Sequence, residues 1–295
     1  MMKAIKWIAA IALLMLFWIC ENSFASDVKI STEKVEQGKF FFVRIENSAP
    51  TFYRIGFLKK QYISLPLLGY TKTQFAVIPV SVGAPVGKTS ISIESELEFI
   101  LPKEIEILKT NFPVFDDVIV NNPLNGSELK RYEKEQDVLK GIYSRNTKYP
   151  FFDERYFIFA NPLDGTPSVS SEFGTVRKIK TGQKGEAQIV SHFGTDYSVP
   201  VRTKVFATET GIVVFAGDFL LSGKTIILDH GFGVFSAYFH LFDIGPKEGD
   251  VALRGELIAL SGATGRVRGA HLHFGVNIHG IWVNPDWFFP PKEKQ

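Results

Sequence analysis

The stretch Gly269-Ala270-His271-Leu272-His273-Phe274-Gly275-Val276 reads as a β-strand that carries two histidines separated by one leucine. Successive side chains on a strand point to opposite faces of the sheet. We therefore expect His271 and His273 to share one face, while Leu272 and Phe274 enter a core on the other face. Two imidazoles side by side on an open face indicate metal or proton chemistry.

A second segment, His192-Phe193-Gly194-Thr195-Asp196, places a histidine and an aspartate four residues apart. A flexible glycine between them would let both side chains turn toward one ion. Zinc accepts imidazole nitrogen and carboxylate oxygen, and three protein ligands leave a fourth position for water. Such a short motif is weak evidence alone, and the third ligand is expected from the pair His271 and His273.

The amino terminus reads as an export signal. Two early lysines precede the uncharged apolar run Trp7–Ile19, and Ser23-Phe24-Ala25 supplies small residues at the spacing of a cleavage site. The run is shorter than the ~18–20 residues of a spanning helix. We expect cleavage after Ala25, or a loose association with the inner membrane if the segment stays uncleaved. Cys20 is the only cysteine, so any metal in the cleaved chain must be held by histidine and carboxylate.

Length and composition indicate two folded domains. The chain has 295 residues, of which 45% are hydrophobic and 14% aromatic, enough for a sizeable core. The net charge of +2 would suit an acidic polymer such as a cell wall and gives no reason to expect a nucleic-acid partner.

The pattern along the chain predicts a mostly β protein. After the signal peptide (residues 1–25) we expect a β-sandwich-like domain over residues 26–120, with alternation such as that of Ile91–Phe99. Turn residues near position 121 then open a helical connector, residues 121–155, in which Ser127 is expected to cap the helix. A second strand-rich domain follows over residues 156–295.

All six histidines lie in this second domain. His240 ends the strand-like segment "FSAYFHL", where alternation predicts that it shares a face with Tyr238. His230, before a glycine turn, is expected to be a structural hydrogen-bonding residue, and His279, at a hairpin tip, to be solvated.

Four motifs in sequence order resemble those of the lysostaphin-type (LytM-like) zinc endopeptidases of bacterial peptidoglycan. They are "SSEFGTVR" from Ser170, "HFGTD" from His192, "AYFHL" from Ala237 and "GATGRVRGAHLHFGV" from Gly262. The resemblance implies an antiparallel β-sheet catalytic domain, preceded here by a β accessory domain.

The resemblance also implies roles for individual residues. His192, Asp196 and His273 match the ligands of one zinc ion per chain, and His271 and His240 match the paired active-site histidines. His271 is assigned the general base and His240 the stabilising role, although the two may be exchanged. Substrate contacts are expected from the residues Arg266, Arg268 and Tyr238.

The implied function is hydrolysis of peptide cross-links in peptidoglycan, at the D-alanyl–meso-diaminopimelate bond, in the periplasm or cell envelope. A polyglycine bridge is the second choice of substrate. The alternative function is a non-hydrolytic, zinc-holding regulator or activator of another wall hydrolase. A third hypothesis is latency, in which the accessory domain or connector blocks the groove.

Overall fold

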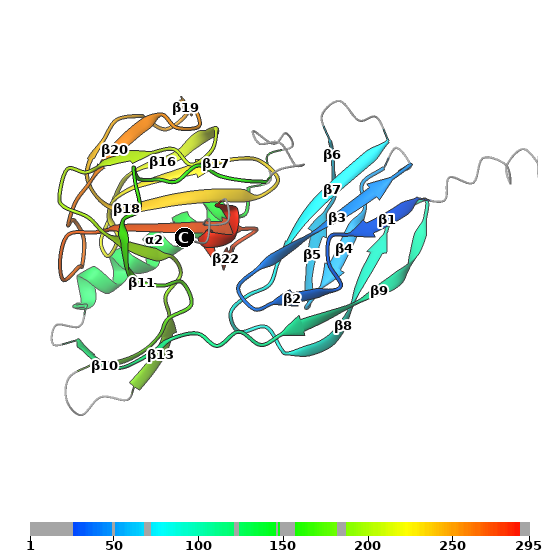
Figure 1. The fold of residues 1–295 in the computed structure, drawn as a ribbon, viewed down its shortest axis with the longest axis horizontal. Helices are drawn as coiled ribbons and strands as arrows, with labels where there is room; N and C mark the ends of the chain where they lie inside the picture. The colour runs from blue at the N-terminus through cyan, green and yellow to red at the C-terminus, as the bar shows by residue number, and fades with distance from the viewer. Residues whose placement is uncertain are drawn as a thin grey trace, which may run out of the picture.

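The computed structural model describes residues 26–48, 51–67, 72–120, 124–145, 147, 157–181 and 187–289. Strands dominate these residues, and the strand pairs are antiparallel except for β2 with β9 and β10 with β12. The prediction of a mostly β protein is confirmed. Figure 1 shows two lobes, one of amino-terminal strands in blue and cyan and one of later strands in green to red. The predicted signal peptide lies outside the described residues.

The amino-terminal lobe is a sandwich of two sheets, with strand orders β1-β3-β7-β6 and β2-β9-β8-β4-β5. Alternating apolar residues from both sheets, among them Val43, Ile45, Ile55 and Ile93, form the core between them. The strands are β1 (Asp27–Ile30), β2 (Lys34–Glu36), β3 (Phe40–Glu46), β4 (Arg54–Phe57), β5 (Lys60–Ile63), β6 (Leu65–Pro66), β7 (Thr73–Pro79), β8 (Gly87–Glu94) and β9 (Phe99–Leu108).

The alternating run Ile91–Phe99 is two strands joined by a turn rather than one strand. The Ser95 hydroxyl accepts hydrogen bonds from the backbone N–H groups of Leu97 and Glu98, at 3.3 and 3.1 Å. This local bond bends the chain between β8 and β9. As a result, the side chains of Leu97 and Phe99 are 69% and 65% exposed instead of entering the sandwich core.

Strand β7 lies between the two lobes and is buried along its whole length. Ala76 and Ile78 belong to the sandwich core, whereas Phe75 and Val77 point to the other face and belong to the core of the second lobe. One strand therefore contributes to two cores through the alternation of its side chains.

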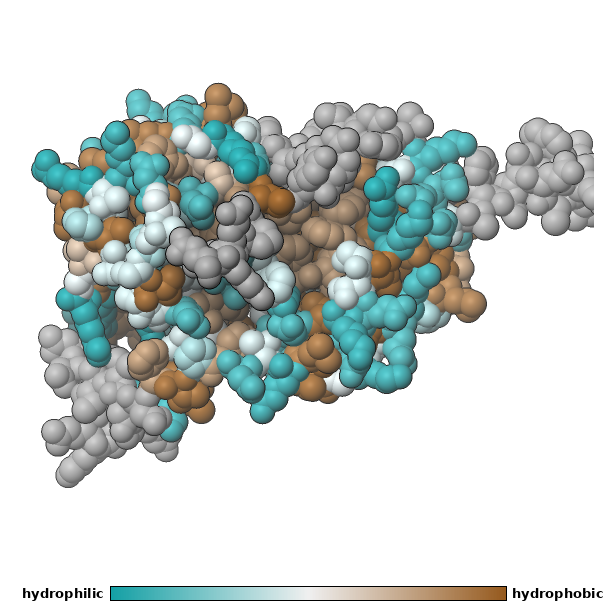
Figure 2. Space-filling view, in the orientation of Figure 1, coloured by the Kyte–Doolittle hydropathy of each residue, from teal (hydrophilic) through white to brown (hydrophobic). Residues whose placement is uncertain are grey.

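The junction between the lobes is aromatic. Phe75 stacks on Phe42 with ring centroids 5.0 Å apart and meets Phe232 of the second lobe edge to face at 5.7 Å. Phe40 lies 4.7 Å from Phe288. Figure 2 shows hydrophobic residues, in brown, gathered where the lobes meet. The lobes therefore share an apolar interface.

The expectation that His279 is solvated is wrong. Its ring lies edge to face on Tyr62 of the sandwich, with centroids 5.4 Å apart, and burial, assisted by the charge of Lys60, lowers the pKa of His279 to about 4. A Cβ at Gly233 would come within 2.2 Å of this imidazole. The hairpin tip that carries His279 is thus part of the interface.

The second lobe is built on one large sheet. Its path is β11-β14-β21-β18-β17-β16-β19, and β15, β20 and β22 attach beside it. Its strands are β11 (Ser168–Ser171), β14 (Thr195–Ser198), β15 (Lys204–Phe206), β16 (Gly211–Phe219), β17 (Gly223–Asp229), β18 (Val234–Ile244), β19 (Val251–Ala252), β20 (Leu257–Ser261), β21 (Leu272–Ile278) and β22 (Ile281–Val283), followed by the 3-10 helix η1 (Pro285–Phe288).

A separate three-stranded sheet links the sandwich to the site. Strand β10 (Val114–Val120) pairs in parallel with β12 (Val176–Thr181), which pairs with β13 (Ala187–Ser191). The strand that leaves the sandwich therefore supports the hairpin that ends immediately before His192.

Helix α2 (Gly126–Tyr143) begins earlier than predicted. Its N-cap is Asn125 rather than Ser127, because the Asn125 side chain accepts from the N–H groups of Ser127 and Glu128 and Glu128 completes a capping box. The helix packs on the sheet through Tyr143, which contacts Phe235 and Trp282. Among the described residues, no helix has the length and apolar character needed to cross a membrane.

The shared strand leads to a stability prediction. Phe75→Ala should lower the free energy of unfolding by about 3–5 kcal/mol, the usual effect of removing a buried aromatic ring. Phe99→Ala removes the same side chain from an exposed position and should change it by less than about 0.5 kcal/mol. Chemical denaturation measures both, and equal effects would contradict a β7 that supports both cores.

Candidate metal centre

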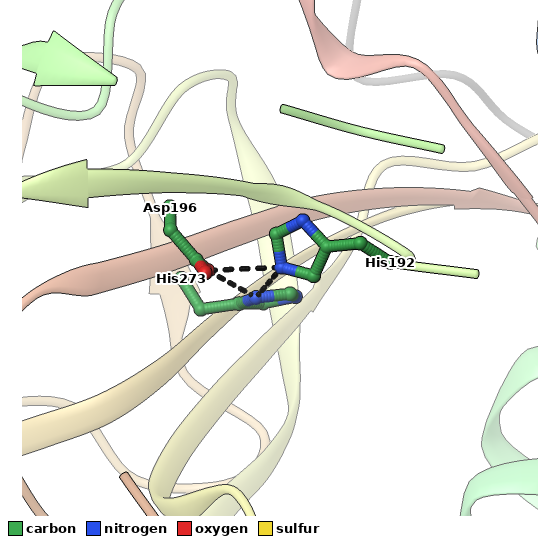
Figure 3. Close-up of side chains that lie close together, drawn as sticks. All are labelled: His192, Asp196 and His273. Carbon is green, nitrogen blue, oxygen red and sulfur yellow. Dashed lines mark hydrogen bonds and ion pairs between the residues drawn. The ribbon is translucent and has the colours of Figure 1, made fainter. Parts of the chain in front are cut away.

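Three side chains from two neighbouring strands and the preceding loop meet at one point. Asp196 on β14 pairs directly with His273 on β21, and His192 lies just before β14. His273 Nδ1 and His192 Nε2 lie 2.7 and 3.0 Å from Asp196 Oδ1, and 3.1 Å from each other. Figure 3 shows the three side chains converging. The structure therefore brings together the three predicted ligands.

Gly194 has a different role from the flexibility first inferred for it. A Cβ at this position would lie 2.4 Å from His273 Nε2 and 2.5 Å from the backbone oxygen of Phe274. Only glycine lets the chain between His192 and Asp196 approach β21 this closely.

The environment of His192 requires a proton or a cation beside Nε2. Its Nδ1 lies 2.9 Å from the backbone oxygen of Glu172 and must donate its hydrogen there, because a carbonyl only accepts. In the neutral ring Nε2 is then unprotonated, yet it faces the carboxylate oxygen of Asp196. Two acceptors at that separation require a proton or a cation between them.

The donor set fits zinc. Two imidazole nitrogens and one carboxylate oxygen, all within 4.8 Å of one another, are a common three-residue zinc set that leaves one coordination position open. Burial opposes ionisation of Asp196, but the hydrogen bonds and charges that His192 and His273 supply when protonated outweigh it and lower the pKa of its carboxyl. The carboxylate is thus anionic and ready to bind a cation.

The alternation predicted around His271 is observed. Leu272 and Phe274 are fully buried in the core, while His271 lies on the face of His273, with Nε2 3.7 Å from Asp196 Oδ1. His271 Nδ1 donates to the backbone oxygen of Gly269 at 2.9 Å. In the neutral ring the lone pair on Nε2 therefore points toward the three convergent side chains.

His240 reaches the site by a route that alternation did not predict. Its backbone φ is 59°, in the left-handed region, and this conformation turns its side chain away from the face of Tyr238. The His240 ring centroid lies 4.7 Å from that of His271 and 6.1 Å from that of His273. The alternation argument was wrong for His240 because it assumed a regular strand.

His240 is held by the loop between β20 and β21. Its Nδ1 donates to the backbone oxygen of Thr264 at 3.0 Å, and the Thr264 hydroxyl donates to the Leu241 backbone oxygen at 2.8 Å. Burial, assisted by the neighbouring His273 and His271, lowers the pKa of His240 to about 4. The imidazole is therefore neutral at neutral pH, with its Nε2 lone pair unprotonated.

The prediction that Tyr238 contacts the substrate is wrong. Its side chain is fully buried, and its hydroxyl accepts from the N–H of Thr208 at 2.9 Å and from the Ser236 hydroxyl at 3.1 Å. Ser236 also bonds the buried His230, whose other nitrogen bonds the backbone oxygen of Thr210. Tyr238 and His230 thus belong to one internal polar network, as predicted for His230.

Arg266 and Arg268 lie exposed on the loop that carries Thr264 and Gly269. The backbone N–H of Arg266 donates to the Leu221 oxygen at 2.8 Å, which attaches this loop to the turn between β16 and β17. The loop that holds both paired histidines therefore also presents two cationic side chains to solvent.

Sequence reasoning missed a residue beside the site. Arg177, within the quoted motif "SSEFGTVR", places Nη2 2.7 Å from Ser171 Oγ and 3.5 Å from Asp196 Oδ2. It thus contacts the oxygen of Asp196 that does not face the histidines. The motif contained the signal, but the contact depends on tertiary structure: the pairing of β11 with β14 places Ser171 opposite Asp196, and Arg177 on β12 reaches both.

The site consists of a histidine–carboxylate set that could hold a metal ion, on an antiparallel β-sheet and flanked by two further imidazoles. Residues 190–285 match Peptidase family M23. This part of the chain is therefore a peptidase M23 domain.

Relatives with known names support this assignment. The chain is 35% identical over 123 residues to the peptidoglycan DD-endopeptidase ShyA of Vibrio cholerae, covering 42% of this chain and 28% of ShyA. It is 39% identical over 94 residues to the DD-carboxypeptidase/endopeptidase Mpg of Neisseria meningitidis, covering 32% of this chain and 22% of Mpg. The chain thus spans less than a third of either relative.

A solved structure shares the fold over most of the chain. A Pseudomonas aeruginosa protein assigned to the M23 peptidases superposes with a TM-score of 0.62 at 24% identity, covering 84% of this chain and 92% of the other. The shared fold thus extends well beyond residues 190–285.

The close approach at Gly194 predicts sensitivity to a single methyl group. Gly194→Ala should weaken zinc binding at least about tenfold, by analogy with the loss of ligand orientation in metal sites. Gly83→Ala is the control, because a Cβ there meets nothing within 4 Å. Competition with a chromophoric chelator measures both, and unchanged affinity in Gly194→Ala would contradict the packing described.

The contact of Arg177 with Asp196 leads to a second prediction. Arg177→Ala should weaken zinc binding about tenfold, because the carboxylate loses the partner that orients it. Arg268→Ala removes an exposed arginine without that contact and should leave zinc affinity unchanged. The same titration measures both, and tighter binding in Arg177→Ala would mean that charge repulsion outweighs orientation.

Proposed function

We propose that this protein is a zinc-dependent endopeptidase that hydrolyses peptide cross-links of peptidoglycan. The observation that carries the proposal is the convergence of His192, Asp196 and His273 beside two further imidazoles. The similarity of this domain to ShyA, which is named a peptidoglycan DD-endopeptidase, supports the substrate class.

In this proposal His192, Asp196 and His273 hold one zinc ion per chain. A bound zinc ion supplies Lewis-acid polarisation of the scissile carbonyl and lowers the pKa of water toward ~7. The hydrogen bond from His192 to the Glu172 oxygen keeps Nε2 directed at the site, and Arg177 holds the second oxygen of Asp196.

His271 and His240 handle protons. Each imidazole donates its Nδ1 hydrogen to a backbone oxygen, which leaves Nε2 as the acceptor. His271, nearer to Asp196, takes the proton of the attacking water and passes it to the leaving amine. His240 stabilises the oxygen that gains negative charge when its Nε2 carries a proton taken up from solvent, because only an N–H can donate a hydrogen bond to that oxygen; the reverse assignment gives the same chemistry.

The proposed substrate bond joins D-alanine to meso-diaminopimelate. Peptide stems carry carboxylates, which the guanidinium groups of Arg266 and Arg268 can bind. Both side chains are exposed on the loop beside His271. A polyglycine bridge would lack these side-chain carboxylates.

The proposed location is the periplasm or cell envelope, where peptidoglycan lies. The proposed organisation is a signal peptide (1–25), a sandwich accessory domain (26–120), a helical connector (121–155) and the peptidase domain (156–295). The sandwich positions the peptidase domain through the interface around Phe75.

The ligand and proton roles predict two different variant phenotypes. His192→Ala and Asp196→Ala should lose both bound zinc and activity, whereas His271→Ala should retain zinc and lose about 10²–10⁴-fold in turnover. Asp243→Ala, at an exposed position on β18, is the control. Metal content by elemental analysis and release of fragments from purified sacculi measure the outcomes.

The same digestion tests the reaction and the bond. Mass spectrometry of released muropeptides should show stems freed at the D-alanyl–meso-diaminopimelate bond. Absence of soluble fragments, with zinc bound at one ion per chain, would instead identify the non-hydrolytic regulator. A His271→Ala protein without zinc would overturn the assignment of the His271 and His273 pair.

A further inference from the structure

On the sandwich, Ser26 and Tyr53 surround the side chain of Glu98. None of these residues belongs to the metal centre. The Ser26 backbone nitrogen donates to Glu98 Oε1 at 3.0 Å, and the Ser26 hydroxyl donates to Oε2 at 2.7 Å. The Tyr53 hydroxyl donates to the same Oε2 at 2.9 Å. Both carboxylate oxygens are therefore directed at one residue, Ser26, and at the buried phenol beside it.

Each partner in this cluster is held by the fold. Glu98 lies on the turn between β8 and β9. There its backbone N–H donates to Ser95 Oγ and its backbone oxygen accepts from the Ser95 N–H. Tyr53 is fully buried in the sandwich. Ser26 immediately precedes β1, whose pairing with β3 starts at Asp27. Three hydrogen bonds from Ser26 and Tyr53 therefore fix the Glu98 carboxylate between the turn and the first strand.

The nitrogen of Ser26 belongs to the peptide bond at which the sequence predicts cleavage of the export signal. The small residues Ser23 and Ala25 predict cleavage of the Ala25–Ser26 bond. Hydrolysis consumes one water: the Ala25 carbonyl gains the hydroxyl, and the Ser26 nitrogen gains the hydrogen. The resulting amine takes up a further proton from solvent, so that the amide N–H, with one hydrogen to donate, becomes at neutral pH an ammonium with three hydrogens and a positive charge.

We propose that Glu98 is the binding site for the α-ammonium group of Ser26, created by cleavage of the export signal. The carboxylate then faces a donor that is also ionised, so the hydrogen bond becomes an ion pair, which is stronger than the bond to the neutral amide. Processing thus fastens the first strand of the sandwich to the turn between β8 and β9. This inference does not depend on the proposed peptidase activity.

The first experiment determines the amino terminus of the exported protein. The full chain is produced in a Gram-negative host, recovered from the periplasm, and its intact mass and terminal peptide are measured. The expected terminus is Ser26. A mature chain that starts at another residue, or that retains residues 1–25, would overturn the proposal.

The second experiment is a double-mutant cycle on thermal stability. Chains that begin at Ser26 or at Phe24 are each compared with their Glu98→Gln variants. Glu98→Gln should lower the Tm of the Ser26 chain by about 2–4 °C more than that of the Phe24 chain, the shift expected for one charge-assisted bond in a chain of this size. Glu96→Gln, on the same turn and exposed, is the matched control.

A measurement without substitutions covers the case in which Glu98→Gln fails to fold. The α-amine of the Ser26 chain should react several-fold more slowly with an amine-directed acylating reagent than that of the Phe24 chain, as followed by mass spectrometry. Equal reactivity, or equal effects of Glu98→Gln in both chains, would show that Glu98 binds no terminal ammonium.

Discussion

The pairing of β14 with β21 places Asp196 directly opposite His273, and the rest of the site depends on that register. A shift of one residue would turn the entire set of side chains on a strand to the opposite face. The same register requires glycine at position 194, where the chain passes against the His273 ring. The register of β14 and β21 therefore fixes three things together: the position of the proposed ligands, the close approach of the backbone at Gly194, and the burial of the apolar side chains on the other face.

Apolar packing on the face of the sheet that carries His273 supports this arrangement. Phe239, which pairs with His273 across β18 and β21, lies with its ring 5.1 Å from that imidazole. Phe239 contacts Trp282, which contacts Tyr143 at the end of α2. The helix before the peptidase domain thus contributes to the packing beside a proposed metal ligand.

The junction of the lobes adds a second constraint. Because β7 places alternate side chains in two cores, separation of the lobes would expose Phe75 together with its partner Phe232. Such a large apolar contact favours one fixed arrangement of the lobes over free rotation. The strand β10 that leaves the sandwich also pairs with the hairpin before His192, so the site is connected to the sandwich through both backbone and core.

Local patterns in the sequence were sufficient for features that need only a strand or a motif. Alternation placed Leu272 and Phe274 in the core and His271 beside His273, and the mostly β fold followed from similar runs. Residue type and motif order identify the five histidine and aspartate candidates. Alternation failed for the run Ile91–Phe99 because the hydroxyl of Ser95 stabilises a turn within it. An alternating pattern contains no information on such a local hydrogen bond.

Only the tertiary structure decided how distant segments meet. His192 and His273 are 81 residues apart in the chain, and their approach depends on strand register, which is set by long-range pairing. The left-handed backbone of His240 and the burial of Tyr238 likewise depend on neighbours supplied by other strands. The sequence by itself determined which residue types were available and which face of a regular strand they occupy. The assembled sheet determined which of them share a site, because contacts across strands are absent from local pattern.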